Sequence, residues 1–244
     1  MKQFTILLAV AVCLSCKPAP QQPSAKKSAA AGPQVRATVV TIRTSVAPEQ
    51  KTFDHTLVIA GDRARSTGEH ETWRLFDTKA DTVTFVDDVE KTIRTEALAS
   101  IVKTRGATLA AALPPHYPRA KLARTKERKT LLGANTEQVV IESGAYRREL
   151  WLGEHPQIPR GLFAMMHASD TPASPLAPMM RAVDEALLRE RGFPLSDRTE
   201  VPLGNGKLVV ERTVTGIVQR EVPETLLALP RDYKDITPKP KPAQ

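Results

Sequence analysis

Residues 71–96 read ETWRLFDTKADTVTFVDDVEKTIRTE, and this stretch decides the fold. Apolar, aromatic and β-branched side chains alternate with polar ones, and two short clusters containing aspartate interrupt the alternation. A period of two residues is typical of a half-exposed β-strand, and aspartate is common in the turns between strands. The pattern predicts strands at 72–76, 82–86 and 91–95, joined by hairpins.

The alternation also predicts which side chains share a face of this sheet. One face is expected to carry the large apolar side chains: Trp73, Leu75, Val83 and Phe85. The other face is expected to carry Arg74, Thr82 and Thr84. The apolar face predicts one wall of a core or of a cavity.

The same kind of alternation continues on both sides of this stretch. It predicts seven further strands, at 34–46, 51–60, 63–66, 138–142, 146–152, 198–203 and 207–218. Apolar residues at helical spacing predict three helices, at 96–113, 158–167 and 178–191. Short connections favour antiparallel neighbours, and no strand–helix–strand repetition indicates a parallel sheet.

These elements indicate the α+β class, mainly antiparallel β. We expect a curved, unclosed sheet of about ten strands, with about three helices covering its concave face. The composition does not change between residues 35 and 236, which favours a single β-rich domain there. Residues 17–34, rich in Pro, Ala, Gln and Lys, predict a flexible tether, and residues 237–244 predict a disordered tail.

The N-terminus has the features of an export signal. Lys2 precedes a mostly apolar run at 4–14, which is too short to span a bilayer as a helix. The run ends in Leu14-Ser15-Cys16, which resembles the signal of bacterial lipoproteins, where the cysteine is lipidated and becomes the mature N-terminus. The resemblance predicts a signal peptide at 1–16 and lipidation of Cys16. An ordinary secretory signal and an uncleaved anchor are the alternatives.

The charge and the cysteines limit the range of partners. The formal charge is +8, and the densest basic run, residues 119–129, contains no aromatic side chain. Proteins that bind single-stranded nucleic acid combine basic and aromatic residues, so no nucleic-acid partner is expected. The run is either an anion- or membrane-binding patch or a solvated charged strand or helix leading into the next hairpin. Both cysteines, Cys13 and Cys16, precede the folded body, which therefore has no disulfide.

Several short motifs resemble a known family. They are Trp73-Arg74-Leu75-Phe76-Asp77, residues 82–87 and 91–92, Gly192-Phe193-Pro194, and residues 229–234. Together they are similar to bacterial lipoproteins of the DUF4412 type, which resemble the LolA, LolB and RseB superfamily. In that superfamily an unclosed antiparallel half-barrel, covered by helices, holds acyl chains. The resemblance implies a half-barrel domain over residues 35–236 with a hydrophobic cavity, and it offers no catalytic motif.

The sequence contains no recognised catalytic motif. The P-loop, the dinucleotide-binding glycine pattern, His-Glu-x-x-His and Gly-x-Ser-x-Gly are all absent. The aspartates of the two hairpin clusters suit calcium, but they are also ordinary turn residues: Asp77, Asp81, Asp87 and Asp88. For residues 165–167 with Met179 and Met180, a soft copper site is an alternative to apolar packing. We predict no enzyme activity, no cofactor and no metal.

Two function hypotheses differ in what the sheet encloses. In the first, a membrane-tethered envelope lipoprotein binds or carries a lipid or another apolar ligand in a half-barrel cavity, without catalysis. These side chains are the expected cavity wall: Trp73, Leu75, Val83, Phe85, Trp151, Phe163, Met165 and Met166. In the second, an envelope scaffold or sensor has a packed, ligand-free core and contacts an envelope protein partner.

Both hypotheses predict the same location. The protein is expected in the cell envelope, lipid-anchored on the periplasmic side of a bacterial membrane, with the outer membrane favoured. If Cys16 is not lipidated, secretion is expected instead. When Cys16 is lipidated, the membrane is a partner through the N-terminal lipid.

Overall fold

The computed structural model describes residues 32–67, 72–111, 120–170, 184, 186–203 and 206–238. The chain divides into two units, residues 1–31 and 32–244, and the described residues all belong to the second. The predicted signal peptide with Cys13 and Cys16 lies outside the described residues, as does most of the predicted tether. Among the described helices, none is both long enough and apolar enough to cross a membrane.

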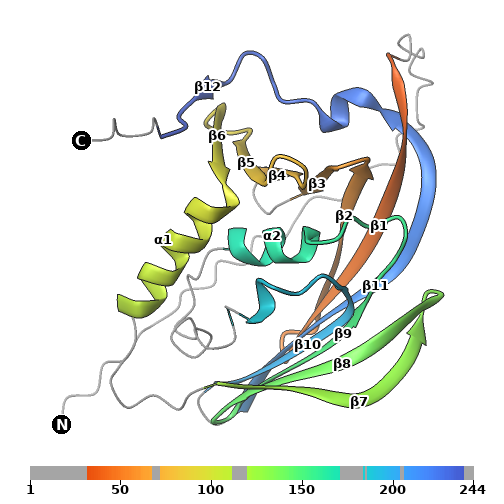
Figure 1. Ribbon diagram of the computed structural model, residues 1–244, viewed down its shortest axis with the longest axis vertical. Helices are drawn as coiled ribbons and strands as arrows, with labels where there is room; N and C mark the ends of the chain where they lie inside the picture. Colours follow the sequence, from red (N-terminus) through yellow and green to blue (C-terminus); the bar gives the residue numbers. More distant parts are fainter. Residues whose placement is uncertain are drawn as a thin grey trace, which may run out of the picture. The chain divides into compact units, whose positions relative to one another are not determined.

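Twelve strands form one sheet (Figure 1). In chain order they are β1 (Gln34–Ala47), β2 (Lys51–Ala60), β3 (Arg63–Thr67), β4 (Thr72–Asp77), β5 (Thr82–Asp87), β6 (Thr92–Ala97), β7 (Lys121–Leu131), β8 (Ala134–Ser143), β9 (Tyr146–Gly153), β10 (Phe193–Leu203), β11 (Gly206–Pro223) and β12 (Lys234–Asp235). Their order across the sheet is β12-β6-β5-β4-β3-β2-β1-β11-β10-β9-β8-β7. Neighbours are antiparallel except for the parallel pair β12–β6. The prediction of a mainly antiparallel, unclosed sheet is confirmed, because β12 and β7 are its two separate edges.

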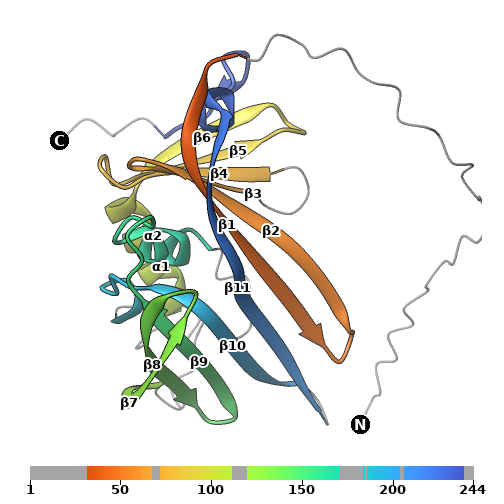
Figure 2. The same cartoon turned by 90° about the vertical axis from the view of Figure 1, so that its right-hand side faces the viewer.

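The long β1–β11 pair joins two antiparallel meanders. β1 to β6 follow one another on one side, and β11 back to β7 follow one another on the other. The pairing runs from Gln34 opposite Pro223 to Ala47 opposite Val209, with an irregularity between Thr41 and Ile42. Figure 2 shows that β4 to β6 run across the direction of β1 and β11. The sheet therefore bends strongly between these two groups of strands.

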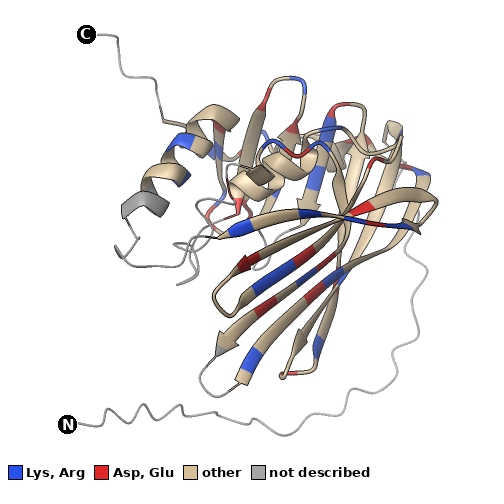
Figure 3. Cartoon of the chain, turned by 60° about the horizontal axis from the view of Figure 1, so that its bottom comes forward, with Lys and Arg blue, Asp and Glu red and all other residues tan. Residues whose placement is uncertain are grey.

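Two strands exceed the predicted number of about ten. β12 spans two residues, too few to produce a recognisable alternation. β7 overlaps the basic run over residues 121–129 and reads KLARTKERKTL, in which charge conceals the alternation. Most of its side chains are exposed, as expected of an edge strand whose charges discourage pairing with another chain. Figure 3 shows charged residues of both signs along the strands of the sheet. The basic run therefore forms an exposed charged strand that leads into the next hairpin, and whether it binds an anion or a membrane stays a prediction.

Two described α-helices, α1 (Leu98–Ala111) and α2 (Leu162–Ser169), accompany the sheet, where three helices were expected. α1 agrees with the helix predicted at 96–113. α2 begins later than predicted, because Gly161 takes a left-handed conformation with φ of 84° immediately before it. Half of the third predicted helix, at 178–191, lies outside the described residues. Of the described half, Asp184, Ala186 and Leu187 are helical and residues 188–191 are not, so the helix ends earlier than predicted.

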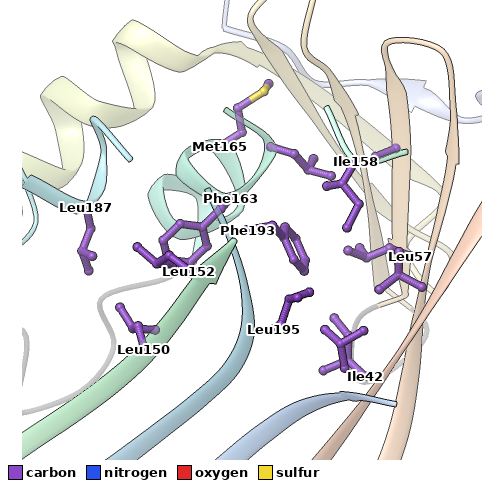
Figure 4. Packing of buried hydrophobic residues seen from close by; sticks show 14 of the residues in the cluster. Ile42, Leu57, Leu150, Leu152, Ile158, Phe163, Met165, Leu187, Phe193 and Leu195 are labelled. Carbon is purple, nitrogen blue, oxygen red and sulfur yellow. The ribbon is translucent and has the colours of Figure 1, made fainter. Parts of the chain in front are cut away.

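The main hydrophobic core lies between the sheet and the helices (Figure 4). Leu57, Leu150 and Leu195 of the sheet and Leu162 and Met165 of α2 are all almost completely buried. Burial of a side chain of this size stabilises the folded state by about 1.5–3 kcal/mol. We call the face of the sheet that carries this core the inner face.

The predicted orientation of Trp73 and Leu75 was wrong, because they lie on the opposite face from Val83 and Phe85. The prediction counted Asp77 as a loop residue, whereas the structure pairs it with the first residue of β5. A loop that is shorter by one residue shifts the pairing register by one. Such a shift turns all side chains of one strand to the opposite face of the sheet.

Trp73 instead belongs to a smaller cluster on the outer face. The C-terminal segment supplies Leu227 and Tyr233 to this cluster. The Trp73 indole Nε1 and the Tyr233 hydroxyl lie 3.1 and 3.0 Å from the same Asp88 carboxylate oxygen. The Arg65 guanidinium lies 3.9 Å from the centre of the Trp73 ring. The C-terminal segment that contains Leu227 and Tyr233 thus packs against the outer face of the first meander.

Replacing Phe76 by alanine is expected to lower the free energy of unfolding by about 3–5 kcal/mol, because this side chain is completely buried in the main core. Urea unfolding followed by circular dichroism measures the loss. The matched control is Val89→Ala, at a side chain that is 62% exposed, where a change within about 0.5 kcal/mol is expected. Equal losses in the two variants would contradict the position of Phe76.

Candidate functional site

A cavity of about 490 Å³ lies between α2 and the inner face of the sheet. Its apolar lining consists of Ile42, Phe53, Phe163, Met166, Phe193, Pro194 and Val214. Its ionisable lining consists of Asp54, His55, Arg74, Arg148, His167, Asp170, Asp197 and Arg212. A cavity of this volume is in the range of small-molecule binding sites. Its lining combines an apolar part with a charged part.

Two further hollows, of about 510 and 740 Å³, both touch Gly153 and Arg191. Neither of them is lined by a residue of α2. The cavity under α2 is the one that combines side chains of the main core with buried charges. It is therefore the candidate site.

Three neighbouring strands, β2, β1 and β11, form the floor of the cavity. One row of directly opposite residues across them is Phe53, Thr44 and Arg212. The next row on the same face is His55, Ile42 and Val214. Directly opposite residues of antiparallel strands project from the same face, so the pairing register alone brings these six side chains together.

One side of α2 forms the opposite wall. Phe163, Met166 and His167 line the cavity, and their spacing of three and four residues puts them on one side of the helix. His167 Nε2 lies 2.7 Å from Asp184 Oδ1, and Arg105 of α1 binds the same carboxylate at 2.6 and 2.8 Å. Burial alone would raise the pKa of Asp184, but hydrogen bonds from His167 and Arg105 lower it. This buried network fixes the wall.

Arg148 of β9 and Asp197 of β10 form a buried ion pair at one side of the cavity. Arg148 Nε and Nη2 donate to the two carboxylate oxygens of Asp197 at 2.9 and 2.8 Å. Burial alone would lower the pKa of Arg148 and raise the pKa of Asp197, but their mutual attraction outweighs burial and reverses both shifts. Both side chains are therefore charged in the folded protein.

Arg212 of β11 is the third charged group on this side. Its Nη1 lies 3.4 Å from Asp197 Oδ2, at the long end of hydrogen-bonding distance. Its side chain is 48% exposed. Burial and the positive charge of Arg212 together lower the pKa of His55, which keeps that imidazole neutral at pH 7.

Thr44 lies directly opposite Arg212 in the floor. Its side chain is 3% exposed, and its hydroxyl has no hydrogen-bond partner among the described residues. A buried hydroxyl without a partner costs about 1–3 kcal/mol. Such a group needs an explanation, and its position in the cavity lining supplies one.

Arg74 and Asp170 connect the first meander to the end of α2. Arg74 Nη1 lies 2.7 Å from Asp170 Oδ1 and 3.2 Å from Ser169 Oγ. The Asp170 side chain is 66% exposed, so this ion pair borders the solvent. It marks the open side of the cavity.

The structure brings together only part of the predicted cavity wall. Phe163 and Met166 line the cavity. Met165, Val83 and Phe85 belong to or pack against the same main core without lining the cavity. The remaining three predicted side chains lie on the outer face: Trp73, Leu75 and Trp151.

Trp151 faces outward because its neighbours Leu150 and Leu152 face the main core. The Trp151 ring is covered by Lys129, whose Nζ lies 3.7 Å from the ring centre. Its Nε1 donates to Glu149 Oε1 at 3.0 Å. The aromatic side chain is thus buried by an amphipathic lysine rather than by a cavity.

The sequence analysis assigned no role to the polar residues of the cavity. These residues are Thr44, His55, Arg148, Asp197 and Arg212. The available signal was a charged residue at the inward position of an alternating strand, as Arg148 is beside Leu150. That signal becomes interpretable only when β9, β10 and β11 are known to be neighbours, because the partner charges lie on different strands.

The hairpin aspartates are turn residues. Asp77 Oδ1 accepts hydrogen bonds from the backbone N–H groups of Lys79 and Ala80, and Asp87 makes the same contacts in the next hairpin. No group of three or more metal-binding side chains occurs in the described part of the chain. Met179 and Met180, of the alternative copper site, lie outside the described residues.

Replacing Asp197 by asparagine is expected to lower the free energy of unfolding at pH 7 by about 3–5 kcal/mol, because Arg148 stays buried without a counter-charge. The control is Glu211→Gln, which removes an exposed partner of Arg198 and should change stability little.

The pH dependence of the Asp197→Asn variant tests the same ion pair. The lowered pKa of Asp197 contributes stability above its unfolded value of about 3.9, and this contribution is lost as the pH falls through the folded value. The difference between wild type and variant should therefore shrink below about pH 4. A difference that is constant from pH 7 to acid would contradict the ion pair.

No protein-family model and no curated protein sequence matches this chain. Among solved structures, two of PNGF-II, in space groups C2 and P21, are similar at 13% and 14% sequence identity, each with a TM-score of 0.45. The similarity covers 84% of this chain and 31% and 32% of those chains, so this chain spans about a third of their length. A similarity at this level carries no argument about function. It does not bear on the resemblance to DUF4412-type lipoproteins, which stays a prediction.

Proposed function

We propose that this chain is a membrane-tethered envelope lipoprotein that binds or carries a hydrophobic ligand in the cavity under α2, without catalysis. The observation that carries the proposal is the cavity of about 490 Å³ between α2 and the inner face of the sheet. The LolA, LolB and RseB superfamily, which the sequence resembles, holds acyl chains in a half-barrel covered by helices, and the bent, open sheet suits such a half-barrel (Figure 2).

The apolar part of the lining supports a hydrophobic ligand. Ile42 and Val214 of the floor face Phe163 and Met166 of the wall across the cavity. Aromatic and methionine side chains adapt to ligands of irregular shape, because they offer large apolar surfaces and, in methionine, a flexible stem. Transfer of an acyl chain from water into such a lining gains about 0.8 kcal/mol per methylene group.

The ion pairs of the lining support a role in ligand binding. Arg148 is bound to Asp197, and His167 is bound to Asp184. Side chains that are held in ion pairs give the cavity a rigid wall. A rigid wall favours binding because its side chains lose little conformational entropy when the ligand binds. No catalytic role is needed to explain any of these four side chains.

A neutral fluorescent probe such as N-phenyl-naphthylamine tests the proposal. The purified protein should enhance its fluorescence, and Val214→Trp, which fills the cavity from the floor, should weaken probe binding by about tenfold or more. The control is Val218→Trp on the same strand, at a side chain that is 53% exposed. Circular dichroism verifies that both variants are folded. If Val214→Trp does not fold, Ile42→Phe replaces it as the variant that fills the cavity.

Equal probe binding by wild type, Val214→Trp and Val218→Trp would contradict the proposal. That result, together with an organic extract that contains no lipid by mass spectrometry, would favour the envelope scaffold or sensor with a ligand-free core.

The membrane tether has its own test. Cys16→Ala should release the protein from membranes and remove the mass of its acyl chains, because a thioether-linked lipid needs the thiol of Cys16. Membrane fractionation and intact-protein mass spectrometry measure both effects. Cys13→Ala is the matched control and should fractionate like wild type. A Cys16→Ala protein that stays on membranes would overturn the lipidated tether while leaving the cavity proposal intact.

A further inference from the structure

The cavity is lined by three carboxylates and by three arginines, Arg74, Arg148 and Arg212, but they do not pair one to one. Its lining carboxylates are Asp54, Asp170 and Asp197. Each is already bound by its own arginine, respectively Arg43, Arg74 and Arg148, with shortest N–O distances of 2.9, 2.7 and 2.8 Å. Arg212 is the remaining lining arginine, and its contact to Asp197 is long, at 3.4 Å. Because Asp54 is bound by Arg43 from outside the lining, Arg212 shares Asp197 with Arg148 and has no second carboxylate among the described lining residues.

The unpartnered hydroxyl of the floor lies beside this charge. Thr44 is directly opposite Arg212 across the β1–β11 pair, and side chains at such positions have Cβ atoms about 4.5–5.5 Å apart. Thr44 lines the cavity, and its buried hydroxyl has no partner among the described residues. A group that accepts hydrogen bonds from both Arg212 and Thr44 would satisfy both side chains.

The field at this point favours an anion over a neutral acceptor. His55, on the floor near Arg212, has a pKa lowered by burial and by the charge of Arg212. The charge of Arg212 acts on this imidazole against the opposing charges of Asp54 and Asp170, and the same Coulomb interaction favours an anion bound beside Arg212. The half-exposed Arg212 side chain gives such an anion access from solvent.

The apolar part of the lining begins next to the polar row. Ile42 and Val214 lie two residues from Thr44 and Arg212 along the same strands, which is about 7 Å on the same face. From there the lining continues to Phe163 of α2. A ligand with its anionic end at Arg212 therefore has its apolar chain along the floor and under the helix.

We propose that the ligand of the cavity is an amphiphile whose anionic head, a carboxylate or a phosphate, is bound by Arg212 and by the hydroxyl of Thr44. This inference rests on the proposed function and adds the chemistry of the head. The carboxylate of a fatty acid and the phosphate of a lipid share this chemistry, because both offer several oxygen acceptors to a guanidinium.

Displacement of the neutral probe by ligands of equal chain length tests whether the cavity prefers an anionic head group. Dodecanoic acid and dodecyl phosphate should bind about tenfold or more tightly than dodecanol, as expected for charge-assisted hydrogen bonds, and dodecylamine should bind most weakly. The stronger of the two anions identifies the fatty acid or the phospholipid as the source of the head.

Variants locate the binding of the head. Arg212→Gln and Thr44→Val should each reduce the affinity for the better anion several-fold while leaving the affinity for dodecanol unchanged. Arg198→Gln is the matched control, since this arginine lies next to Asp197 on β10 and binds Glu200 and Glu211 instead of lining the cavity. Thr44→Val should also unfold at no lower temperature than wild type, because the hydroxyl that it removes has no partner among the described residues.

The outcomes separate this inference from the proposed function. Equal affinity for the anions and dodecanol, or an anion preference that survives Arg212→Gln, would overturn the anionic head while the hydrophobic cavity stands. Failure of all four ligands and of the probe would overturn both.

Discussion

The pairing of β1 with β11 is the constraint on which the rest of the structure depends. It joins the first strand of the described unit to the last long one, and it connects the two meanders into one sheet. The floor of the cavity is a direct product of its register, which puts Thr44 opposite Arg212 and Ile42 opposite Val214. A slip by one residue would turn these side chains of one strand to the outer face and abolish the cavity floor.

The second constraint is the placement of charge beside an apolar core. A buried pair such as Arg148 and Asp197 loses hydration on folding, and an apolar pair of similar volume often stabilises a protein as well or better. The fold nevertheless has this pair next to Arg212 and next to Thr44, whose hydroxyl has no hydrogen-bond partner in the described part of the chain. A site that must recognise a charged head beside an apolar chain accounts for this arrangement, whereas a core built for stability alone does not.

The strands were predictable from the sequence because alternation and turn residues are local signals. Residues 51–60 were predicted with the boundaries that β2 has. The face of each side chain was less predictable, because it depends on whether Asp77 ends a strand or begins a loop. The polar half of the site could not be predicted, because Arg148, Asp197 and Arg212 belong to three strands whose adjacency is not encoded in any one of them.

Photolabelling with a fatty acid that carries a diazirine on its chain tests the central claim most directly, because it reports which side chains touch the bound ligand. The account predicts that peptide mass spectrometry finds the label on the cavity lining, at Phe163 and Met166 of α2 and Phe53 of β2. Labelling confined to the outer cluster around Trp73, or no labelling above that of an unfolded control, would contradict a ligand site under α2.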